Sequence, residues 1–493
     1  MLTGVPLRRR HEVLVTDDPD HLRGEFPESE VAAVVLAAGK GTRMVSEMPK
    51  VLHPLAGRPM LLRVLRMLGG AGFSRPAIVV GYGADHIHEV VGESYPLVVQ
   101  EKQLGTGDAA RLALEALPSG TRLLAVMHGD EPLLPPKVLE DMLALQGRTS
   151  SPVVLLTTLV EDTRGFGRVV RNEAGAAVAL VQESELSEEQ RRSREVNLGA
   201  YVFDAAFLRE TLPRLAPHSP KGEYFLTDVI GVAANRAESG EGLPVETIQI
   251  EGGTDIMGIN DLAQLEEAGR RIYRETNRRH MLSGVTIVDS ASTFIDDEVE
   301  IGADTVIQPF TILQGSTSIG RRCRIGPNVQ VHDSTIGDGS RILASTLEGS
   351  TVGAGVTVGP YSHLRAGARV EDGAEIGNYA EIKNSSIGRA TRMHHVGYIG
   401  DAEVGADVNI GAGTITGNFD GHRKHRTVIE DNAFIGIDTM LRAPVRVGEG
   451  ASTGAGSVVL HDVPPGAVVA GVPARAIRKR RAEEKADASE ERT

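Results

Sequence analysis

Glycines and basic residues gather in one short stretch that follows an apolar run. The stretch reads LAAGKGTRM over residues 36–44 and PKVL over residues 49–52. A glycine-rich turn after a strand lets backbone N–H groups approach phosphates closely, and the N-terminus of the next helix favours negative charge. Arg43 and Lys50 add mobile positive charge beside such a turn. These residue types predict a binding site for a nucleoside triphosphate.

The glycine spacing separates this turn from two common phosphate-binding motifs. No G-x-x-x-x-G-K-[ST] string occurs in the chain, which excludes a Walker A loop. Gly39-Lys40-Gly41 also lacks the third glycine that a dinucleotide-binding fingerprint requires. The spacing therefore argues against an ATPase and against a dehydrogenase.

The complete string, LAAGKGTRM followed by PKVL, resembles the sugar-nucleotide pyrophosphorylase family. Residues 100–107 (QEKQLGTG) resemble the loop with which that family recognises uracil, and residues 128–130 (HGD) resemble its metal-binding motif. Asp130 ends an apolar, strand-like run, where a carboxylate can reach Mg²⁺ on the phosphates. The resemblance implies that Asn260 shares this Mg²⁺ with Asp130.

The resemblance also implies which residues bind UTP and the UDP-sugar. Gln100 and Gly105 would read the edge of the base. Gly167, Glu183 and Asn197 would hold the sugar. The complete implied set is Leu36, Ala37, Ala38, Gly39, Lys50, Gln100, Gly105, Thr106, Asp130, Gly167, Glu183, Asn197 and Asn260.

The implied reaction is an in-line attack by a sugar-1-phosphate oxygen on the α-phosphorus of UTP, which expels pyrophosphate. Such a reaction needs positioning and charge neutralisation more than a covalent protein group. Lys50 and Arg43, together with Mg²⁺, are therefore the expected catalytic groups, and we expect no nucleophilic side chain in this half. His128 and Phe166 depart from the family pattern at the edge of the site.

A second set of polar residues lies in a repetitive region. It reads LRAG (364–367), NYAEIK (378–383), HHVGYIGD (394–401) and NIGAGTITGNFDG (409–421). In order and spacing these strings resemble the family of bifunctional UDP-N-acetylglucosamine pyrophosphorylases/glucosamine-1-phosphate N-acetyltransferases. The resemblance extends from Val31 to about Arg478. It implies that acetyl-CoA and glucosamine-1-phosphate are further substrates.

Carried over residue by residue, the resemblance implies that His395 is a general base for the sugar amine. Imidazole suits this role because its ordinary pKa of about 6.5 lies near working pH. Arg365 and Lys383 would clamp the sugar phosphate, and Tyr398 and Asn409 would position the sugar. Ala412 and Ala455 are expected beside coenzyme A, and Asn418 and Phe419 belong to the same substrate and acetyl-CoA site.

The same region contains an interruption and two departures from the family. Ile410 and Ile429 are separated by 19 residues where the repeat requires 18, which predicts an excursion that forms a binding loop. Its basic residues 422–426 would face the phosphates of coenzyme A. Phe419 replaces the usual Tyr, and Ile437 stands where a Ser commonly contacts acetyl-CoA.

Two different sequence periods must position these residues. From Val31 to about Leu262, short apolar runs alternate with amphipathic helical stretches, which predicts a Rossmann-like α/β domain with a mostly parallel sheet. The runs expected as strands are 31–37, 77–80, 123–127 and 153–158, and the expected helices include 60–68 and 108–116. The apolar spacing of residues 262–282 predicts a connecting helix.

After Ser283, aliphatic residues recur every six residues, as in Ile301, Ile307, Leu313 and Ile319. Such a hexapeptide repeat predicts a parallel β-helix in which the aliphatic residue fills the interior. Parallel crossovers are usually right-handed. The left-handed sense of this β-helix is therefore implied by the resemblance alone. Cys323, the single cysteine, is expected to be a buried packing thiol.

Composition limits the function further. The net charge of −14 argues against non-specific nucleic-acid binding. No run approaches the roughly 20 apolar residues that span a membrane, and the chain is expected to be cytoplasmic. The expected divisions are a disordered extension (1–30), the nucleotidyltransferase domain (31–262), a linker helix (263–283), the β-helix (284–478) and a disordered charged tail (479–493).

The resemblance also implies a homotrimer and a combined product. Glucosamine-1-phosphate would become N-acetylglucosamine-1-phosphate and then UDP-N-acetylglucosamine, a cell-wall precursor in bacteria. Two alternatives remain open at this point. One is a nucleotidyltransferase whose β-helix only assembles the oligomer, and the other is a non-catalytic sugar-nucleotide sensor. The intact set Arg43, Lys50, Asp130 and Asn260 argues against the sensor.

Overall fold

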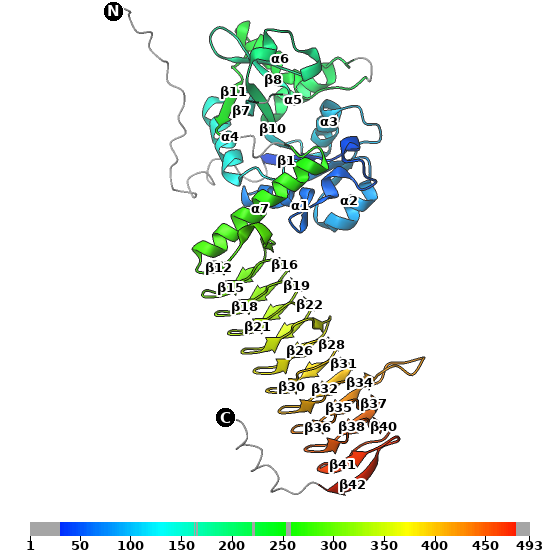
Figure 1. Ribbon diagram of the computed structural model, residues 1–493. Helices are drawn as coiled ribbons and strands as arrows, with labels where there is room; N and C mark the ends of the chain where they lie inside the picture. The colour runs from blue at the N-terminus through cyan, green and yellow to red at the C-terminus, as the bar shows by residue number, and fades with distance from the viewer. Residues whose placement is uncertain (1–29, 162, 164–165, 219–221, 253–257, 480–493) are drawn as a thin grey trace, which may run out of the picture. The chain divides into compact units, whose positions relative to one another are not determined.

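The computed structural model describes residues 30–161, 163, 166–218, 222–252 and 258–479 (Figure 1). The chain divides into two compact units between Ala268 and Gly269. This division falls inside helix α7 (Leu262–Leu282), which was expected as a linker over residues 263–283. Most of α7 therefore belongs to the second unit.

The first unit is built on a mostly parallel sheet, as the alternating pattern predicts. Its strand order is β11-β7-β10-β6-β1-β4-β5, and only β10 runs antiparallel to its neighbours along this path. A β8–β9 hairpin is attached through β10. The strands are β1 (Val31–Leu36), β4 (Ala77–Val80), β5 (Leu97–Val99), β6 (Leu123–His128), β7 (Val153–Leu159), β8 (Arg168–Arg171), β9 (Ala177–Val181), β10 (Glu195–Asp204) and β11 (Glu246–Ile250).

Helices cover both faces of this sheet because the side chains of each strand alternate between two cores. In β1, Val34 packs with α3, α5 and α6, whereas Val35 packs with α1, α2 and α4. The helices are α1 (Met60–Gly70), α2 (Ala84–Val91), α3 (Thr106–Ala116), α4 (Pro136–Thr149), α5 (Ala205–Thr211) and α6 (Asp228–Glu238). The four strands and two helices expected by residue range are all present, with ends that differ by one or two residues.

The second unit is a parallel β-helix with three long sheets. The sheets begin at β12 (Thr286–Ile287), β13 (Phe294–Ile295) and β14 (Glu300–Ile301), and each coil adds one short strand to each sheet. The aliphatic residues of the six-residue repeat fill one continuous core, which contains Ile307, Leu313 and Ile319. Cys323 is fully buried in that core, and burial raises the pKa of its thiol.

Both ends of the folded region extend further than predicted. Glu30, expected in the extension, accepts hydrogen bonds from Arg122 N and Leu123 N and pairs with the Arg122 side chain at 3.3 Å. Lys479, expected in the tail, ends β42 (Arg475–Lys479), which pairs antiparallel with β41 (Ala467–Ala470). This strand covers backbone groups that the last parallel coil would otherwise expose. Residues 1–29 and 480–493 lie outside the described residues.

The helix α7 holds a histidine whose environment opposes protonation. His280 is 6% exposed, and its Nε2 has no hydrogen-bond partner among the residues that the structure describes. Burial and the charge of Arg279 lower the pKa of His280 to about 4.

We expect acid to destabilise the protein through this residue. The unfolded chain binds the proton near pH 6.5 and the folded chain only near pH 4, so stability falls as the pH drops through that interval. At pH 5 the loss is about 1–2 kcal/mol. In thermal unfolding of the full chain, His280→Leu should lose less Tm between pH 7 and pH 5 than the wild type, with the exposed His461→Leu as control. An equal loss of Tm in His280→Leu would contradict this expectation.

Candidate active sites

The predicted phosphate turn depends on one glycine. Gly41 has φ +63°, and a Cβ at this position would lie 2.4 Å from Cβ of Lys50. Only glycine therefore lets the turn pack against the short helix that Lys50 begins, η2 (Lys50–Leu52). The turn can therefore lie directly against Lys50.

Four of the predicted residues converge beyond the ends of β1 and β6. The Lys50 Nζ pairs with the Asp130 carboxylate and donates to Asn260 Oδ1 at 2.9 Å. Arg43 Nη2 donates to the same Asn260 oxygen at 2.7 Å. Two cations, a carboxylate and an amide oxygen thus meet in one place, although they come from separate parts of the chain.

This arrangement suits a triphosphate and a magnesium ion. Carboxylate and amide oxygens are hard donors of the kind that Mg²⁺ prefers, and Mg²⁺ usually completes its shell with water and phosphate oxygens. Among residues 30–479, apart from the undescribed gaps, no group of three or more His, Cys, Asp or Glu side chains is suited to hold a metal. Asp130 and Asn260, the two predicted ligands, both contact Lys50 Nζ.

The predicted uracil loop is fixed at both ends. Gln103 Nε2 donates to the backbone carbonyl of Ala38 at 2.8 Å, which links this loop to the phosphate turn. Gly105 has φ +96°, and a Cβ there would lie 2.5 Å from the carbonyl oxygen of Tyr224. Thr106 Oγ1 accepts a hydrogen bond from Leu226 N at 3.0 Å. These contacts connect the loop to the phosphate turn and to residues 224–226.

Two polar side chains lie near the positions that the resemblance assigns to the sugar. One is the predicted Asn197, and the other is Gln182, which was not predicted. Asn197 Nδ2 donates to the Tyr201 hydroxyl at 2.5 Å, while the buried Asn197 Oδ1 has no partner among the described residues. At Gly167 the nearest side chain is Gln182, whose Oε1 lies 4.0 Å from the position of a Cβ. Glu183 instead begins the next short helix, η4 (Glu183–Glu185). Glu183 stays a prediction, and the structure adds Gln182 beside Gly167.

A buried acid in the same region was also missed. Glu131 follows Asp130 and is 8% exposed, and burial raises the pKa of its carboxyl well above the usual range. Its Oε1 lies 1.9 Å from where a Cβ of Gly199 would be, so this carboxyl fills the space that the glycine leaves. The only sequence signal for Glu131 is that it follows Asp130 directly after an apolar strand. Burial likewise lowers the pKa of the neighbouring His128.

In the second unit, parallel register aligns the predicted phosphate clamp. Leu364 of β25 (His363–Leu364) pairs with Ile382 of β28 (Ala380–Lys383), so Arg365 and Lys383, which follow them, lie on adjacent coils. On β31 (Gly397–Gly400), the position after Ile399 is Gly400. A Cβ there would lie 2.2 Å from the Tyr398 hydroxyl oxygen. Gly400 is the residue aligned with Lys383 on the next coil. Because it has no side chain, the Tyr398 hydroxyl can lie there, next to Arg365 and Lys383 in the same row.

A buried acid that the sequence did not single out supports this row. Asp401 accepts hydrogen bonds from Asn384 Nδ2 at 2.6 Å and Asn418 Nδ2 at 2.5 Å. Asn418 Nδ2 also reaches the Tyr398 hydroxyl at 3.4 Å. Burial raises the pKa of Asp401, but the two amides and the nearby Lys424 outweigh burial, so its pKa lies below the usual value.

His395 lies at the opposite end of the same strand, β31. The register places His395, Ala412, Ile437 and Ala455 at equivalent positions on successive coils, and all lie before strands of the second sheet. His395 is exposed. It precedes Tyr398 by three residues, at the bend before β31 begins. Asn409 lies apart from both, on β33 (Asn409–Ile410) of the first sheet.

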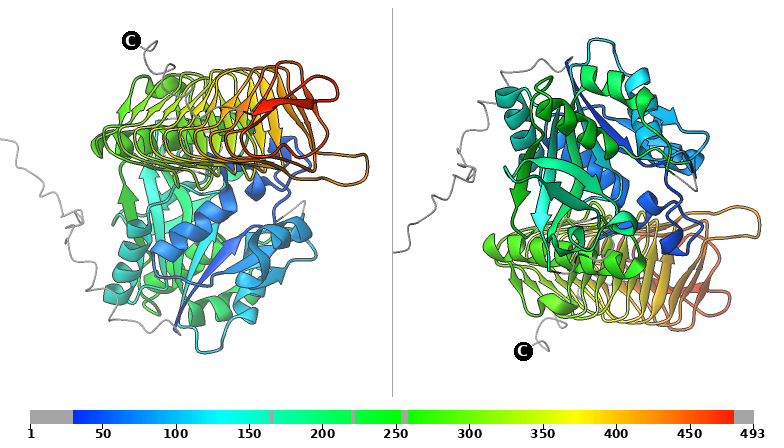
Figure 2. Two further views of the ribbon diagram at one scale, coloured as in Figure 1. Left: turned by 90° about the horizontal axis from the view of Figure 1, so that it is seen from below. Right: turned by 90° about the horizontal axis from the view of Figure 1, so that it is seen from above.

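The predicted excursion is a hairpin-like loop over residues 418–426. It leaves the coils between β34 (Thr414–Gly417) and β35 (Thr427–Ile429) and projects from them in Figure 1 and in both views of Figure 2, where it is orange. Phe419 pairs with Lys424, and Asp420 bonds His425 at 2.6 Å. Hydrogen bonds from Arg423 N and from His425 lower the pKa of Asp420 to about 2.

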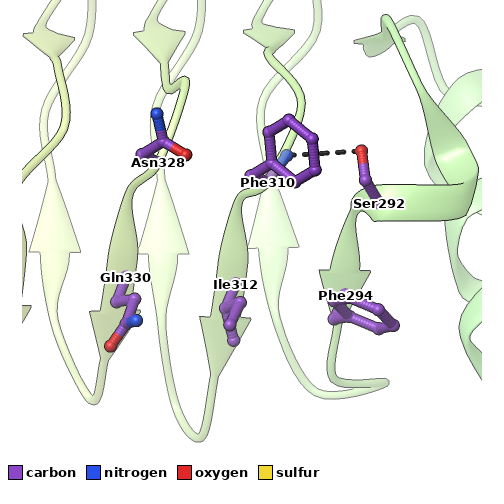
Figure 3. A pocket seen from close by; sticks show the side chains of 6 residues that line it. All are labelled: Ser292, Phe294, Phe310, Ile312, Asn328 and Gln330. Carbon is purple, nitrogen blue, oxygen red and sulfur yellow. Dashed lines mark hydrogen bonds between the residues drawn. The ribbon is translucent and has the colours of Figure 1, made fainter.

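Exposed apolar side chains follow one corner of the coils. Phe310, Tyr361, Tyr379 and Val396 occupy equivalent positions before strands of the second sheet and are each more than half exposed. We call these four residues the apolar ridge. Where the ridge begins, Phe310 borders a hollow of about 280 Å³ (Figure 3), lined by Ser292, Phe294, Phe310, Ile312, Asn328 and Gln330.

Comparison with known families divides the chain in the same way. Residues 33–196 match the model of the MobA-like NTP transferase domain. Residues 298–333, 349–384 and 426–461 match the model of the bacterial transferase hexapeptide (six repeats). None of the helices in the described part of the chain is long and apolar enough to cross a membrane.

Relatives similar to this chain over most of its length are named bifunctional protein GlmU. The protein of Carboxydothermus hydrogenoformans is 43% identical over 431 residues, which cover 87% of this chain and 95% of the relative. That of Heliobacterium modesticaldum is 43% identical over 437 residues, covering 88% and 94%. That of Mycobacterium marinum is 41% identical over 457 residues, covering 91% and 92%.

We expect Asp401 to hold the root of the 418–426 loop. Asp401→Ala removes the charged acceptor of the Asn384 and Asn418 side-chain amides, and the loss of a hydrogen bond to a charged group costs about 1.5–3 kcal/mol. Hydrogen exchange followed by mass spectrometry should show faster exchange of amides in residues 414–427. Glu403→Ala removes the half-exposed ion pair of Glu403 with Arg426 and should change exchange little, because exposed pairs are worth about 0–1 kcal/mol. Equal exchange in both variants would contradict the assignment.

Proposed function

The chain belongs to the family of bifunctional GlmU proteins, and we propose that its two units perform the two consecutive steps of UDP-N-acetylglucosamine synthesis. In the first step, acetyl-CoA acetylates glucosamine-1-phosphate. In the second step, UMP passes from UTP to N-acetylglucosamine-1-phosphate, and pyrophosphate leaves. One observation carries this proposal: a single chain contains both the NTP transferase match and the hexapeptide match. The similarity to the Carboxydothermus hydrogenoformans relative extends over both parts.

For uridylyl transfer, the convergence of Lys50, Arg43, Asp130 and Asn260 supports a site at the triphosphate. The sugar phosphate attacks the α-phosphorus, and negative charge builds up on the phosphate oxygens. Lys50 and Arg43 neutralise that charge when they turn from the protein oxygens that they now contact to the phosphates. Gln100 and Gly105 hold the base. Gly167, Glu183 and Asn197 hold the sugar, and Gln182, which lies beside Gly167, can assist them.

Asp130 and Asn260 fit a magnesium ion because they offer two hard oxygen donors linked through Lys50. When bound, Mg²⁺ supplies charge stabilisation at the phosphates and orients them. The chain's own contribution is to place the two oxygens beside the phosphate turn. The absence of a Cβ at Gly41 lets the phosphate turn lie against Lys50, which contacts both oxygens.

For acetyl transfer, the row of Arg365 and Lys383 supports a phosphate clamp. With the phosphate there, the sugar lies along the second sheet and its amine points toward His395, at the bend that precedes β31. His395 takes the amine proton as the amine attacks the thioester carbonyl, so that a C–N bond forms, the C–S bond breaks and coenzyme A leaves. Asn418, held by Asp401 and Tyr398, presents its amide oxygen to the substrate.

Coenzyme A is expected along the row that continues from His395. Ala412 and Ala455 are small and leave room for an extended ligand, and the basic loop 418–426 can pair with its phosphates. Ile437 in this row supplies an apolar contact where a hydroxyl is common in the family. Phe419 is 61% exposed at the start of the loop and offers a ring to the same ligand.

A homotrimer accounts for the apolar ridge. Four large side chains exposed along one corner, with the Tyr361 and Tyr379 rings stacked at 5.4 Å, form a surface that a second coil can cover. The hollow beside Phe310 continues this surface toward the first coils. Hexapeptide coils that pack corner to face would also shield His395, which is exposed in the single chain.

The two activities should separate by mutation. His395→Ala removes the base and should lower acetyl transfer by about 10²–10⁴-fold, while uridylyl transfer to N-acetylglucosamine-1-phosphate stays at the wild-type rate. Lys50→Ala should lower uridylyl transfer by about 10²–10³-fold and leave acetyl transfer unchanged. The measurements are coenzyme A release and pyrophosphate release, with each cosubstrate omitted in turn. Wild-type protein without acetyl transfer would contradict the bifunctional proposal.

Metal removal should affect only one of the two steps. We expect EDTA to abolish pyrophosphate release and to leave coenzyme A release at its full rate, because the groups proposed for acetyl transfer are an imidazole base and two cations, which need no metal. Asp130→Asn should raise the Mg²⁺ concentration for half-maximal uridylyl transfer by about tenfold or more, since a charged ligand is lost. An unchanged Mg²⁺ requirement would remove Asp130 from the site.

A further inference from the structure

Asp108 is a buried acid in the first turn of α3 that neither the motif nor the reaction accounts for. We propose that Asp108 is a positioning residue that makes the nucleobase site selective for a pyrimidine with an N3–H group. It does so by fixing the orientation of the Gln100 side-chain amide. This inference rests on the proposed uridylyl transfer and adds the source of its base specificity.

The hydrogen bonds around Gln100 leave one orientation of its amide. Gln100 Nε2 donates to Asp108 Oδ2 at 2.8 Å and to the carbonyl oxygen of Gly105 at 3.1 Å. Both partners can only accept, so both amide hydrogens are used and the nitrogen must face them. The opposite orientation would place the amide oxygen against two oxygens. Among the residues that the structure describes, none donates a hydrogen bond to Gln100 Oε1. This oxygen can therefore accept a hydrogen bond from the ligand.

This fixed amide is complementary to an imide edge. Uracil and thymine present a donor, N3–H, beside the acceptor O4, whereas cytosine presents the acceptor N3 beside an amino donor. Gln100 Oε1 can accept from N3–H, and the backbone N–H of Gly105 can donate to a carbonyl oxygen of the base. With cytosine, Gln100 Oε1 would face the N3 lone pair. A site of this kind rejects the analogue whose edge leaves its polar groups unpaired.

Asp108 is itself held in place, so it can impose this orientation. Its Oδ1 accepts from Arg111 Nη2 at 2.7 Å, and Arg111 Nη1 in turn donates to Glu115 at 2.7 Å. Both carboxylate oxygens of Asp108 are therefore engaged, one by Arg111 and one by Gln100. An acid in the first turn also stabilises α3 through the helix dipole, but that effect has no influence on the choice of base.

The experiment compares kcat/KM for UTP and CTP in the full-length protein, with N-acetylglucosamine-1-phosphate and Mg²⁺. We expect the UTP/CTP ratio to fall by about tenfold in Asp108→Ala, because one charge-assisted hydrogen bond to Gln100 is lost and the amide can turn over. Asp108→Asn keeps one carbonyl oxygen and should fall less. Glu115→Gln is the matched control, since it changes the other partner of Arg111 and leaves Gln100 untouched.

The outcomes separate this inference from the proposed function. Acetyl transfer should match the wild type in each variant, whereas the Tm of Asp108→Ala should fall because the hydrogen bonds of Asp108 with Arg111 and Gln100 are lost. A UTP/CTP ratio in Asp108→Ala that stays within about threefold of the wild type overturns the role of Asp108. A wild-type enzyme that transfers no nucleotide to N-acetylglucosamine-1-phosphate would instead overturn the proposed function itself. A fall in the ratio with Glu115→Gln as large as with Asp108→Ala would assign the effect to the helix and not to Gln100.

Discussion

Parallel pairing of short strands determines where the functional side chains of both units lie. In the first unit, Leu36 of β1 pairs with His128 of β6, so the phosphate turn and Asp130 emerge at the same edge of the sheet. In the second unit, parallel register repeats on each coil, and residues at equivalent positions lie about 4.8 Å apart. Arg365 and Lys383 become neighbours in this way. The same type of main-chain hydrogen bonding thus assembles two unrelated sites.

This dependence explains why so much of the fold could be predicted. Apolar runs, amphipathic stretches and a six-residue period are local patterns, and each corresponds to an element or a coil. The family and the fold class are confirmed by the relatives and the domain matches. Lys50 and Asp130 could be chosen from motifs because each lies next to the end of an element. Their convergence with Asn260 follows from the topology, and their roles remain predictions.

The residues that sequence reasoning missed depend on contacts between distant segments. Glu131 is buried because Gly199 on β10 leaves room for its carboxyl, and no local pattern reveals that pair. Gln182 lies beside Gly167, whereas the next residue, Glu183, begins η4, and no local pattern separates the two. Asp401 looks like one of several turn residues with positive φ, such as Asp304 and Asp333. Only its burial under Asn384 and Asn418 distinguishes it.

The two proposed sites share one arrangement, in which an acid fixes the orientation of a side-chain amide. A side-chain amide has a donor end and an acceptor end, and a substrate can be recognised only if one end is chosen in advance. Gln100 has its nitrogen bound by Asp108, and Asn418 has its nitrogen bound by Asp401. In both cases the acid is largely buried, so the amide oxygen remains for the ligand. Since a buried acid left without its partners costs free energy, the orientation is enforced by folding and precedes substrate binding.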